Sequence, residues 1–447
     1  MKHRIVRAAM AAFTVLVMSP AARASEAITL DARLAQPVMK EGAPSKNYLK
    51  VALKGCEPEP AQNRPPVNVA FVIDKSGSMS GPRIAQARAA TILAISRLNP
   101  DDIASVVVFD HRVDLLIPAQ HVRDRGLFTD MVERIGTGGT TAIYDGVLRG
   151  GDEALKSRNL GRLNRVVLLS DGQANVGPSR VDDFSRLGAS LLAQGVSVST
   201  IGLGLGYNED LLLELARTSD GNHAFAREPS DLIQIFNREF NDVLSSCAQT
   251  VSIDIDLLPG VRAVKAVSRD GNIDGGKAQF RMNQVYAATE HYVLLEVEID
   301  AGKAVGGEQD LGVVKVAYVK AGGQRETLDT SVRGRFTASE DDVKAAADPK
   351  VGEVVLEQVA RARAREAVTL RDKGQHEQAR QLLMQNAMEI QGYAAAVPTT
   401  SQQLIDLGQR YGTLSTVAPS AAPSALETQR KALRELDANR AGTGRRY

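Results

Sequence analysis

Residues 67–82 read V-N-V-A-F-V-I-D-K-S-G-S-M-S-G-P and join an apolar run to a small polar loop. Such a run of apolar residues is typical of a strand that is covered on both faces of a parallel sheet. The run ends at Asp74, and Ser76 and Ser78 follow it on either side of Gly77. A carboxylate and two hydroxyls can therefore converge above the edge of the sheet, and hard oxygen donors of this kind suit Mg²⁺ or Mn²⁺.

Two later segments resemble this one in character. Residues 138–146 read G-G-T-T-A-I-Y-D-G, and residues 166–172 read V-V-L-L-S-D-G, a hydrophobic strand that ends in an acidic residue. Together with D-x-S-x-S at residues 74–78, and in the same order along the chain, they resemble the three metal loops of von Willebrand factor type A (VWA) domains. The resemblance implies a Rossmann-like, doubly wound α/β fold with a metal-ion-dependent adhesion site, and strands alternate with helices from residue 67 to residue 247.

The resemblance implies a set of metal ligands, namely Asp74, Ser76, Ser78, Thr141 and Asp171. The two serines would coordinate directly through their hydroxyls, whereas Asp74 would act directly or through water and Asp171 mainly through water. Thr141 precedes the A-I-Y-D sequence that follows the coordinating threonine in related domains, and Thr140 is the alternative. The cation would be Mg²⁺, with Mn²⁺ or Ca²⁺ as alternatives. A purely structural interpretation is that these side chains cap the helix that starts near Pro82.

A site with three hydroxyls and few bound carboxylates leaves a cation incompletely neutralised. The resemblance therefore implies a non-enzymatic protein-binding module in which an Asp or Glu carboxylate of the partner completes the coordination. Specificity would come from residues around the site. The expected members of this rim are Arg83, Asp110, His111, Tyr144, Gln173, Asn175 and the loop at residues 202–207.

Other function classes remain as alternatives. A structural assembly factor would bind through a β-sandwich or a helical hairpin in the later part of the chain and use the metal only to support the fold. A hydrolase or phosphotransferase could use Asp74, but aspartyl nucleophiles of this kind need a second acidic residue two positions later, where this chain has Ser76. The glycines at residues 202–206 fail the G-x-G-x-x-G spacing of a dinucleotide loop, and the six histidines show no zinc-site spacing.

The composition of the 447 residues argues against some classes of ligand. The formal net charge is +1, so no excess of basic residues indicates binding to nucleic acid or to an anionic membrane. Aromatic residues make up 4% of the chain and Trp is absent, which argues against stacking platforms for bases. The length predicts two or three structured units.

The first 24 residues have the layout of a signal peptide. Basic residues precede the apolar run at residues 8–18, and Ala22-Arg23-Ala24 forms a small-residue cleavage site. We expect export to the periplasm or the medium, with an uncleaved anchor as the alternative. No later segment is apolar and long enough to predict a membrane span.

We expect further divisions along the chain. Alternating patterns predict strands at residues 25–56 and a β-sandwich at 250–336, and the VWA domain either precedes this sandwich or is inserted in it. Cys56 and Cys247 flank the VWA segment, which favours a disulfide in an oxidising compartment over two separate thiols. The full division is a signal peptide at 1–24, strands at 25–56, a Pro-rich linker at 57–66, the VWA domain at 67–247, the sandwich at 250–336, a helical hairpin region at 339–396 and a mostly flexible tail at 397–447. Short helices at 401–411 and 426–438 are expected as exceptions within this tail.

This layout resembles bacterial exported VWA proteins that are related to the inter-alpha-trypsin-inhibitor heavy chains and to the calcium-activated chloride-channel homologues. In related domains, affinity changes when the last helix of the α/β unit slides. Here that helix is expected at residues 230–244 and runs directly into Cys247, so a disulfide would hinder the sliding or make the affinity depend on redox state.

Overall fold

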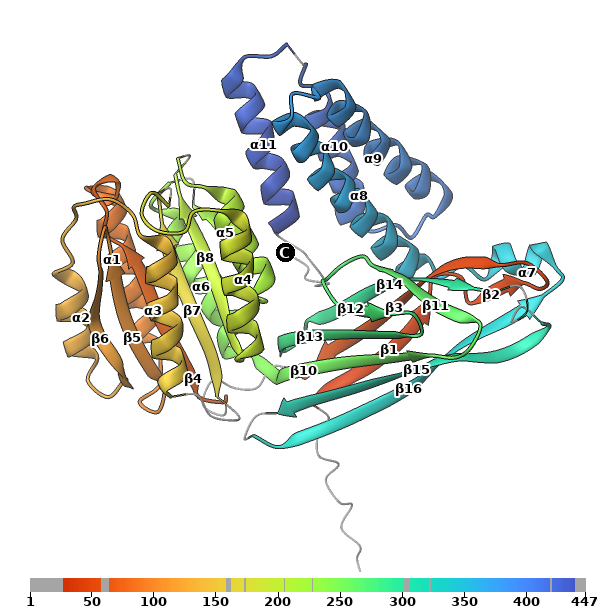
Figure 1. The fold of residues 1–447 in the computed structure, drawn as a ribbon, viewed down its shortest axis with the longest axis horizontal. Helices are drawn as coiled ribbons and strands as arrows, with labels where there is room; N and C mark the ends of the chain where they lie inside the picture. The colour runs from red at the N-terminus through yellow and green to blue at the C-terminus, as the bar shows by residue number, and fades with distance from the viewer. Residues whose placement is uncertain are drawn as a thin grey trace, which may run out of the picture.

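The computed structural model describes residues 27–438, apart from residues 58–63, 158–161, 173, 205, 227, 301, 303–304, 321–322 and 419. The predicted signal peptide therefore lies outside the described residues, as does most of the predicted linker. Figure 1 shows an α/β layer, a pair of β-sheets beside it and a group of helices above both. Among the described helices, none combines the length and the apolar character needed to cross a membrane.

The α/β unit is built on a six-stranded sheet with the order β6-β5-β4-β7-β8-β9. Only β6 is antiparallel to its neighbour. Every residue of β4, β5, β7 and β8 is buried, which explains why their sequences are nearly continuous apolar runs. The strands are β4 (Val67–Asp74), β5 (Ile103–Phe109), β6 (Val113–His121), β7 (Leu163–Ser170), β8 (Val196–Leu203) and β9 (His223–Ala226).

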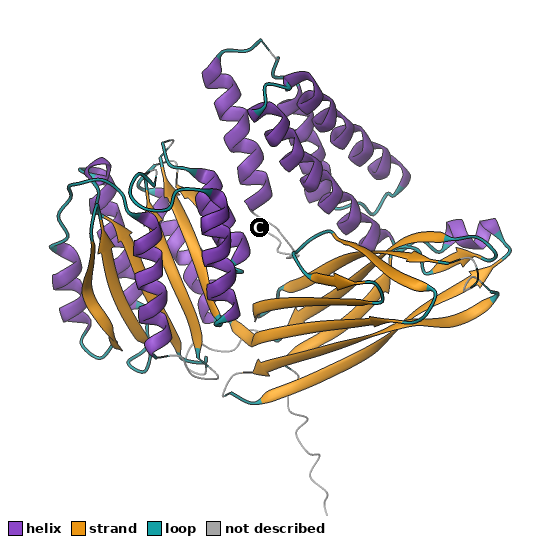
Figure 2. Cartoon of the chain, in the orientation of Figure 1, coloured by secondary structure: helices purple, strands orange, loops and turns teal. Residues whose placement is uncertain are grey.

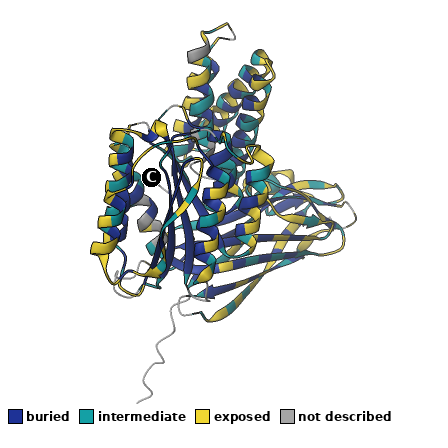
Figure 3. Cartoon of the chain, turned by 60° about the vertical axis from the view of Figure 1, so that its left-hand side comes forward, coloured by how far each residue is buried: buried dark blue, intermediate teal, exposed yellow. Residues whose placement is uncertain are grey.

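Helices cover both faces of this sheet (Figure 2). Helices α1 (Pro82–Ser96), α2 (Arg125–Glu133) and α6 (Asp231–Leu244) share one apolar core with the sheet, and α3 (Ile143–Lys156), α4 (Val181–Ala193) and α5 (Glu209–Thr218) share the other. In Figure 3 the sheet between these helices is the most continuously buried part of the unit. The predicted doubly wound α/β fold is confirmed.

The sandwich consists of a four-stranded sheet, β1-β3-β14-β11, packed on a six-stranded sheet, β12-β13-β10-β15-β16-β2. Strands β1 and β3 come before the α/β unit in sequence, whereas β10 to β16 come after it. The α/β unit is therefore inserted between β3 and β10. The bounds are β1 (Ile28–Leu34), β2 (Val38–Lys40), β3 (Ser45–Gly55), β10 (Ser246–Leu257), β11 (Val261–Ala266), β12 (Asn272–Asp274), β13 (Lys277–Tyr286), β14 (Glu290–Ile299), β15 (Gly307–Lys320) and β16 (Arg325–Thr337).

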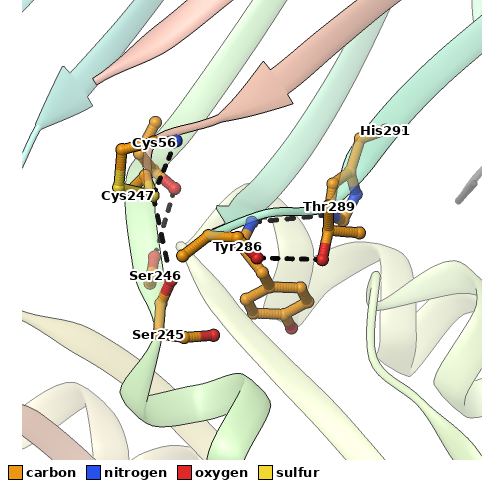
Figure 4. Close-up of a disulfide and its surroundings, with 9 residues drawn as sticks. Cys56, Ser245, Ser246, Cys247, Tyr286, Thr289 and His291 are labelled. Atoms are coloured by element: carbon orange, nitrogen blue, oxygen red, sulfur yellow. Dashed lines mark hydrogen bonds between the residues drawn. A yellow bond between two sulfur atoms is a disulfide. The ribbon is translucent and has the colours of Figure 1, made fainter. Parts of the chain in front are cut away.

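A disulfide lies at the junction of the two units (Figure 4). Cys56 directly follows β3 and Cys247 belongs to β10, and their Cα atoms are 5.9 Å apart. The backbone of Cys56 also accepts a hydrogen bond of 2.9 Å from the amide of Ala288 in the same sandwich. The bond joins the chain where it leaves the sandwich to the chain where it returns, which confirms the predicted pairing.

The helical region extends further than the sequence predicts. Helices α7 (Glu340–Ala345), α8 (Pro349–Asp372) and α9 (His376–Ala396) are followed by α10 (Gln402–Ser415) and α11 (Pro423–Ala438). Within the predicted tail at residues 397–447, the two helices α10 and α11 lie where helices are expected as exceptions, and both are longer than expected. The apolar side chains of α10 and α11 pack on α8 and α9 in one core, a contact that the Ala-, Ser- and Pro-rich composition of the segment hides.

Candidate metal centre

The candidate metal centre lies where the strand order of the α/β sheet reverses. Strand β4 has β5 on one side and β7 on the other, and all three run parallel. In a doubly wound sheet, the connections leave such a point toward opposite faces and open a crevice at the carboxyl ends of the strands. Asp74 is the last residue of β4 and Asp171 follows the last residue of β7, so both carboxylates are placed at this crevice.

The carboxylate of Asp74 is fully buried and is held by the loop that follows it and by the end of β7. Its Oδ1 accepts a hydrogen bond of 2.8 Å from the amide of Ser76, and its Oδ2 accepts one of 2.5 Å from Ser170 Oγ. Burial raises the pKa of Asp74 to about 6, although the hydrogen bonds from Ser170 and Ser76 oppose this rise. A positive charge beside this carboxylate would favour its ionised form, which is what a cation site requires.

The hydroxyls of Ser76 and Ser78 lie side by side. Their Oγ atoms are 3.1 Å apart, and Ser78 Oγ donates a hydrogen bond of 2.7 Å to Asp171 Oδ1. Two adjacent oxygen ligands of an octahedral Mg²⁺ ion would be about 3 Å apart, given Mg–O distances of about 2.0–2.1 Å. Since the Ser78 hydroxyl donates its hydrogen bond to Asp171, its lone pairs remain available, and the pair of hydroxyls fits such a cation.

Thr141 closes the same space from the loop before α3. A Cβ atom added at Gly172 would lie 3.0 Å from Thr141 Oγ1 and 3.4 Å from Asp74 Oδ2, so the glycine leaves open a gap that both oxygens border. The amide of Thr141 donates a hydrogen bond of 2.8 Å to Asn175 Oδ1, which fixes this loop to the loop after β7. Thr141 is buried whereas Thr140 is exposed. This arrangement favours Thr141 as the ligand.

Backbone hydrogen bonds join the first two loops. The amide of Gly77 donates to Gly139 O at 3.1 Å, and the amide of Gly138 donates to Lys75 O at 2.8 Å. Helix α3 begins at Ile143, so both Thr140 and Thr141 precede the helix. The loops therefore form one connected platform that brings all five predicted ligands into the same crevice.

Among the described rim residues, Arg83 directly contacts two predicted ligands, Ser78 and Asp171. Its Nη1 donates a hydrogen bond of 3.0 Å to Ser78 O and another to Asp171 Oδ2. The sequence places Arg83 on the rim but gives no sign of this ion pair, because the residues are 88 positions apart.

Asn175, another predicted rim residue, bonds Thr141 through its side chain and its amide. Asp110, His111 and Tyr144 have other partners. Asp110 pairs with Lys75, which the sequence analysis missed, and its Oδ1 lies 3.0 Å from His111 Nδ1. The ring of Tyr144 packs edge-on against Phe184, with the ring centroids 5.7 Å apart. Gln173 and Leu205 lie outside the described residues.

The chemistry of the centre is dominated by hydroxyls. Among the described side chains, no group of three or more His, Cys, Asp or Glu residues could hold a metal ion, and the crevice itself contributes two carboxylates. A cation held here would keep part of its positive charge, because one of the two carboxylates, that of Asp171, is already paired with Arg83 and the hydroxyls are neutral.

Comparisons with known proteins identify the α/β unit. The family model described as von Willebrand factor type A domain matches residues 68–238, and these residues form a VWA domain. An uncharacterized protein of Synechocystis sp. is 28% identical over 302 residues, which are 65% of this chain and 70% of that protein. Inter-alpha-trypsin inhibitor heavy chain H3 of Homo sapiens is 31% identical over 173 residues, which are 36% of this chain and only 19% of the relative.

Solved structures share the fold over most of the chain. A von Willebrand factor type A protein from Catenulispora acidiphila superposes with a TM-score of 0.73 at 17% identity, over 94% of this chain and 98% of that one. The ArnB paralog VWA2 from Sulfolobus acidocaldarius gives a TM-score of 0.64 at 16% identity, over 92% and 97% of the two chains. At these identities, the likeness concerns the fold alone.

Proposed function

We propose that the protein is a non-enzymatic module that binds a partner protein through a divalent cation, with Mg²⁺ as the first candidate. The observation that carries the proposal is the convergence of two carboxylates and three hydroxyls at the switch point of the VWA sheet. Asp74, Ser76, Ser78, Thr141 and Asp171 would hold the cation directly or through water. When bound, the cation would supply an electrophile that an Asp or Glu side chain of the partner can coordinate.

The residues of the chain have separate tasks in this proposal. Ser76 and Ser78 offer neutral oxygens at a spacing that suits adjacent ligands. Asp74 fixes the first loop through the amide of Ser76, and Asp171 orients the hydroxyl of Ser78. One carboxylate bound to a reluctantly dehydrated Mg²⁺ gives little affinity, so the rim must add the contacts that select the partner.

We also propose that the protein works outside the cytoplasm, in the periplasm or the medium. The layout of residues 1–24 supports export, and the Cys56–Cys247 disulfide fits an oxidising compartment. Detection of the mature chain, beginning near Ser25, in the envelope or the medium would test this. A full-length chain in the cytoplasm would contradict it.

A capture experiment tests the proposed binding. The mature chain is immobilised and exposed to native envelope and medium fractions in Mg²⁺, in chelator, and, as the Asp74→Ala variant, in Mg²⁺. We expect partners that appear only with the wild-type chain in Mg²⁺, and mass spectrometry would identify them.

Two further variants make the capture experiment specific. The double variant Ser76→Ala, Ser78→Ala removes two proposed ligands without deleting the buried carboxylate. Ser80→Ala is the matched control, because its exposed hydroxyl belongs to the same loop and bonds Gly77 O and Thr137 Oγ1 but is not a proposed ligand. Capture that persists in chelator and in both ligand variants would move the binding surface to the sandwich or the helices.

A further inference from the structure

Arg83 occupies a position that a helix disfavours for a cationic side chain. It is the second residue of α1, and the first turn of this helix has no acidic residue. Helix N-termini carry a partial positive charge, so a guanidinium there gains nothing from the helix itself. Its position must be explained by a neighbour outside α1.

That neighbour is Asp171. The side chain of Asp171 is fully buried, while that of Arg83 is 39% exposed, so the pair joins the floor of the crevice to its rim. Arg83 Nη1 binds Asp171 Oδ2, and Ser78 Oγ binds Asp171 Oδ1 at 2.7 Å. Both oxygens of this carboxylate are therefore engaged, one of them by a permanent positive charge.

Arg83 also contacts the loop that follows β8. A Cβ atom added at Gly204 would lie 3.2 Å from Arg83 Nη2, so the guanidinium runs along the loop after β8. Its Nη1 bonds the carbonyl of Ser78 in the loop after β4 as well. One side chain thus contacts the loops that follow β4, β7 and β8.

We propose that Arg83 competes with the cation for the carboxylate of Asp171 and thereby sets the cation affinity of the site. This inference rests on the proposed function. A cation that approaches Ser78 and Asp171 meets a carboxylate whose charge is already shared with the guanidinium, and the two positive charges repel each other. Arg83 must leave Asp171, or remain at a cost, whenever the cation binds.

The competition can be measured by isothermal titration of the full chain with MgCl2 and with MnCl2. Arg83→Gln removes the charge and should bind either cation on the order of fivefold more tightly, since a single charge interaction that is screened by water has about this effect. Arg83→Lys keeps the charge but loses the planar fork, and its affinity should lie between the two. Arg97→Gln, at the other end of α1 about 20 Å away, is the matched control and should bind as wild type does.

The outcomes separate this inference from the proposed function. Wild-type binding combined with equal or weaker binding by Arg83→Gln would overturn the competition, since Arg83 would then only orient Asp171. Absence of cation binding in both wild type and Arg83→Gln would overturn the proposed metal site together with the inference. Arg83→Leu repeats the measurement with an apolar side chain, so the result does not depend on the folding of one variant.

Discussion

Arg165 Nη1 lies 3.5 Å from Glu239 Oε1, and both side chains are buried, although one belongs to strand β7 and the other to helix α6. Arg165 also donates to Ser199 Oγ at 2.9 Å, and to Gln284 and Tyr286 of the sandwich. A buried charge is stable only when it is paired and hydrogen-bonded. This network therefore ties the last helix of the VWA domain to its sheet and to the neighbouring unit.

Arg165→Met should destabilise the protein strongly. It leaves the carboxylate of Glu239 buried without its counter-charge, and breaking a buried pair in this way costs about 3–5 kcal/mol. Denaturant unfolding would measure the loss. The double variant Arg165→Met, Glu239→Leu should recover part of it, because no unpaired charge remains. A loss below about 1 kcal/mol for the single variant would show that the network contributes little.

Removal of the disulfide should lower the free energy of unfolding, because the unfolded chain gains conformational entropy. Cys56 and Cys247 are 191 residues apart, and closing a loop of this length restricts the unfolded state by about 5 kcal/mol in the entropy model. The double variant Cys56→Ser, Cys247→Ser should lose an amount of this order in denaturant unfolding. A negligible loss would mean that the Arg165 network already holds the junction.

The same bond bears on partner affinity. Helix α6 ends at Leu244 and β10 begins at Ser246, so Cys247 holds the segment that directly follows the helix. If the disulfide fixes the position of α6, reductant should change the affinity for a captured partner. Equal affinity with and without reductant, in a sample shown to contain the disulfide, would contradict the hypothesis that the redox state controls partner affinity.

Much of the VWA unit can be predicted from the sequence because short stretches of residues carry the patterns that define its strands and loops. The apolar run of β4, Asp74 at its end and Asp171 directly after β7 predict where the crevice opens. Contacts between distant side chains carry no such signal. The pair of Arg83 and Asp171 spans 88 positions, and Arg165 occurs in a strand that reads as an ordinary buried one.

In the sandwich, the pairing of strands that are distant in sequence likewise cannot be predicted from local patterns. Alternating residues predict β3 and β14, but their pairing joins Lys50 to Leu294 across the whole inserted domain, and no turn links them. Strand β12, at residues 272–274, is short and polar, so its pattern alone does not predict a strand. Its neighbour β13 supplies the backbone hydrogen bonds that form it.

His223 should make stability depend on pH. Its Nδ1 lies 2.8 Å from Thr200 Oγ1 and its Nε2 lies 3.2 Å from Tyr207 OH, and burial lowers the pKa of His223 to about 4 from its usual 6.5. Because the unfolded chain binds the proton more readily, the contribution of neutral His223 is fully present above about pH 6.5 and is lost as the pH falls toward 4.

Thermal unfolding at several pH values would check this expectation. Wild type should lose melting temperature between about pH 6.5 and pH 4, and His223→Asn should show a shallower dependence because it does not titrate. Carboxylates titrate near the lower end in both proteins, so only the difference between the two slopes reports on His223. Identical slopes would contradict the prediction.

The adjacent threonines before α3 provide the sharpest test of the ligand set. Thr141 is buried beside Asp74 and Gly172, whereas Thr140 is exposed. Thr141→Val keeps the branched shape and removes the hydroxyl, so Mg²⁺ affinity should fall on the order of 100-fold, at least as much as the loss of an outer-shell partner causes. Thr140→Val should remain within about twofold of wild type, since a surface hydroxyl outside the crevice contributes little.

Titration with MgCl2 would compare the two variants, which differ by one position and carry the same substitution. Melting temperatures measured without added cation would show whether Thr141→Val still folds, because its amide keeps the hydrogen bond to Asn175 Oδ1. Loss of binding in Thr140→Val alone would transfer the ligand role to Thr140. Unchanged binding in both would remove the threonine hydroxyls from the coordination and leave Ser76 and Ser78 as the hydroxyl ligands.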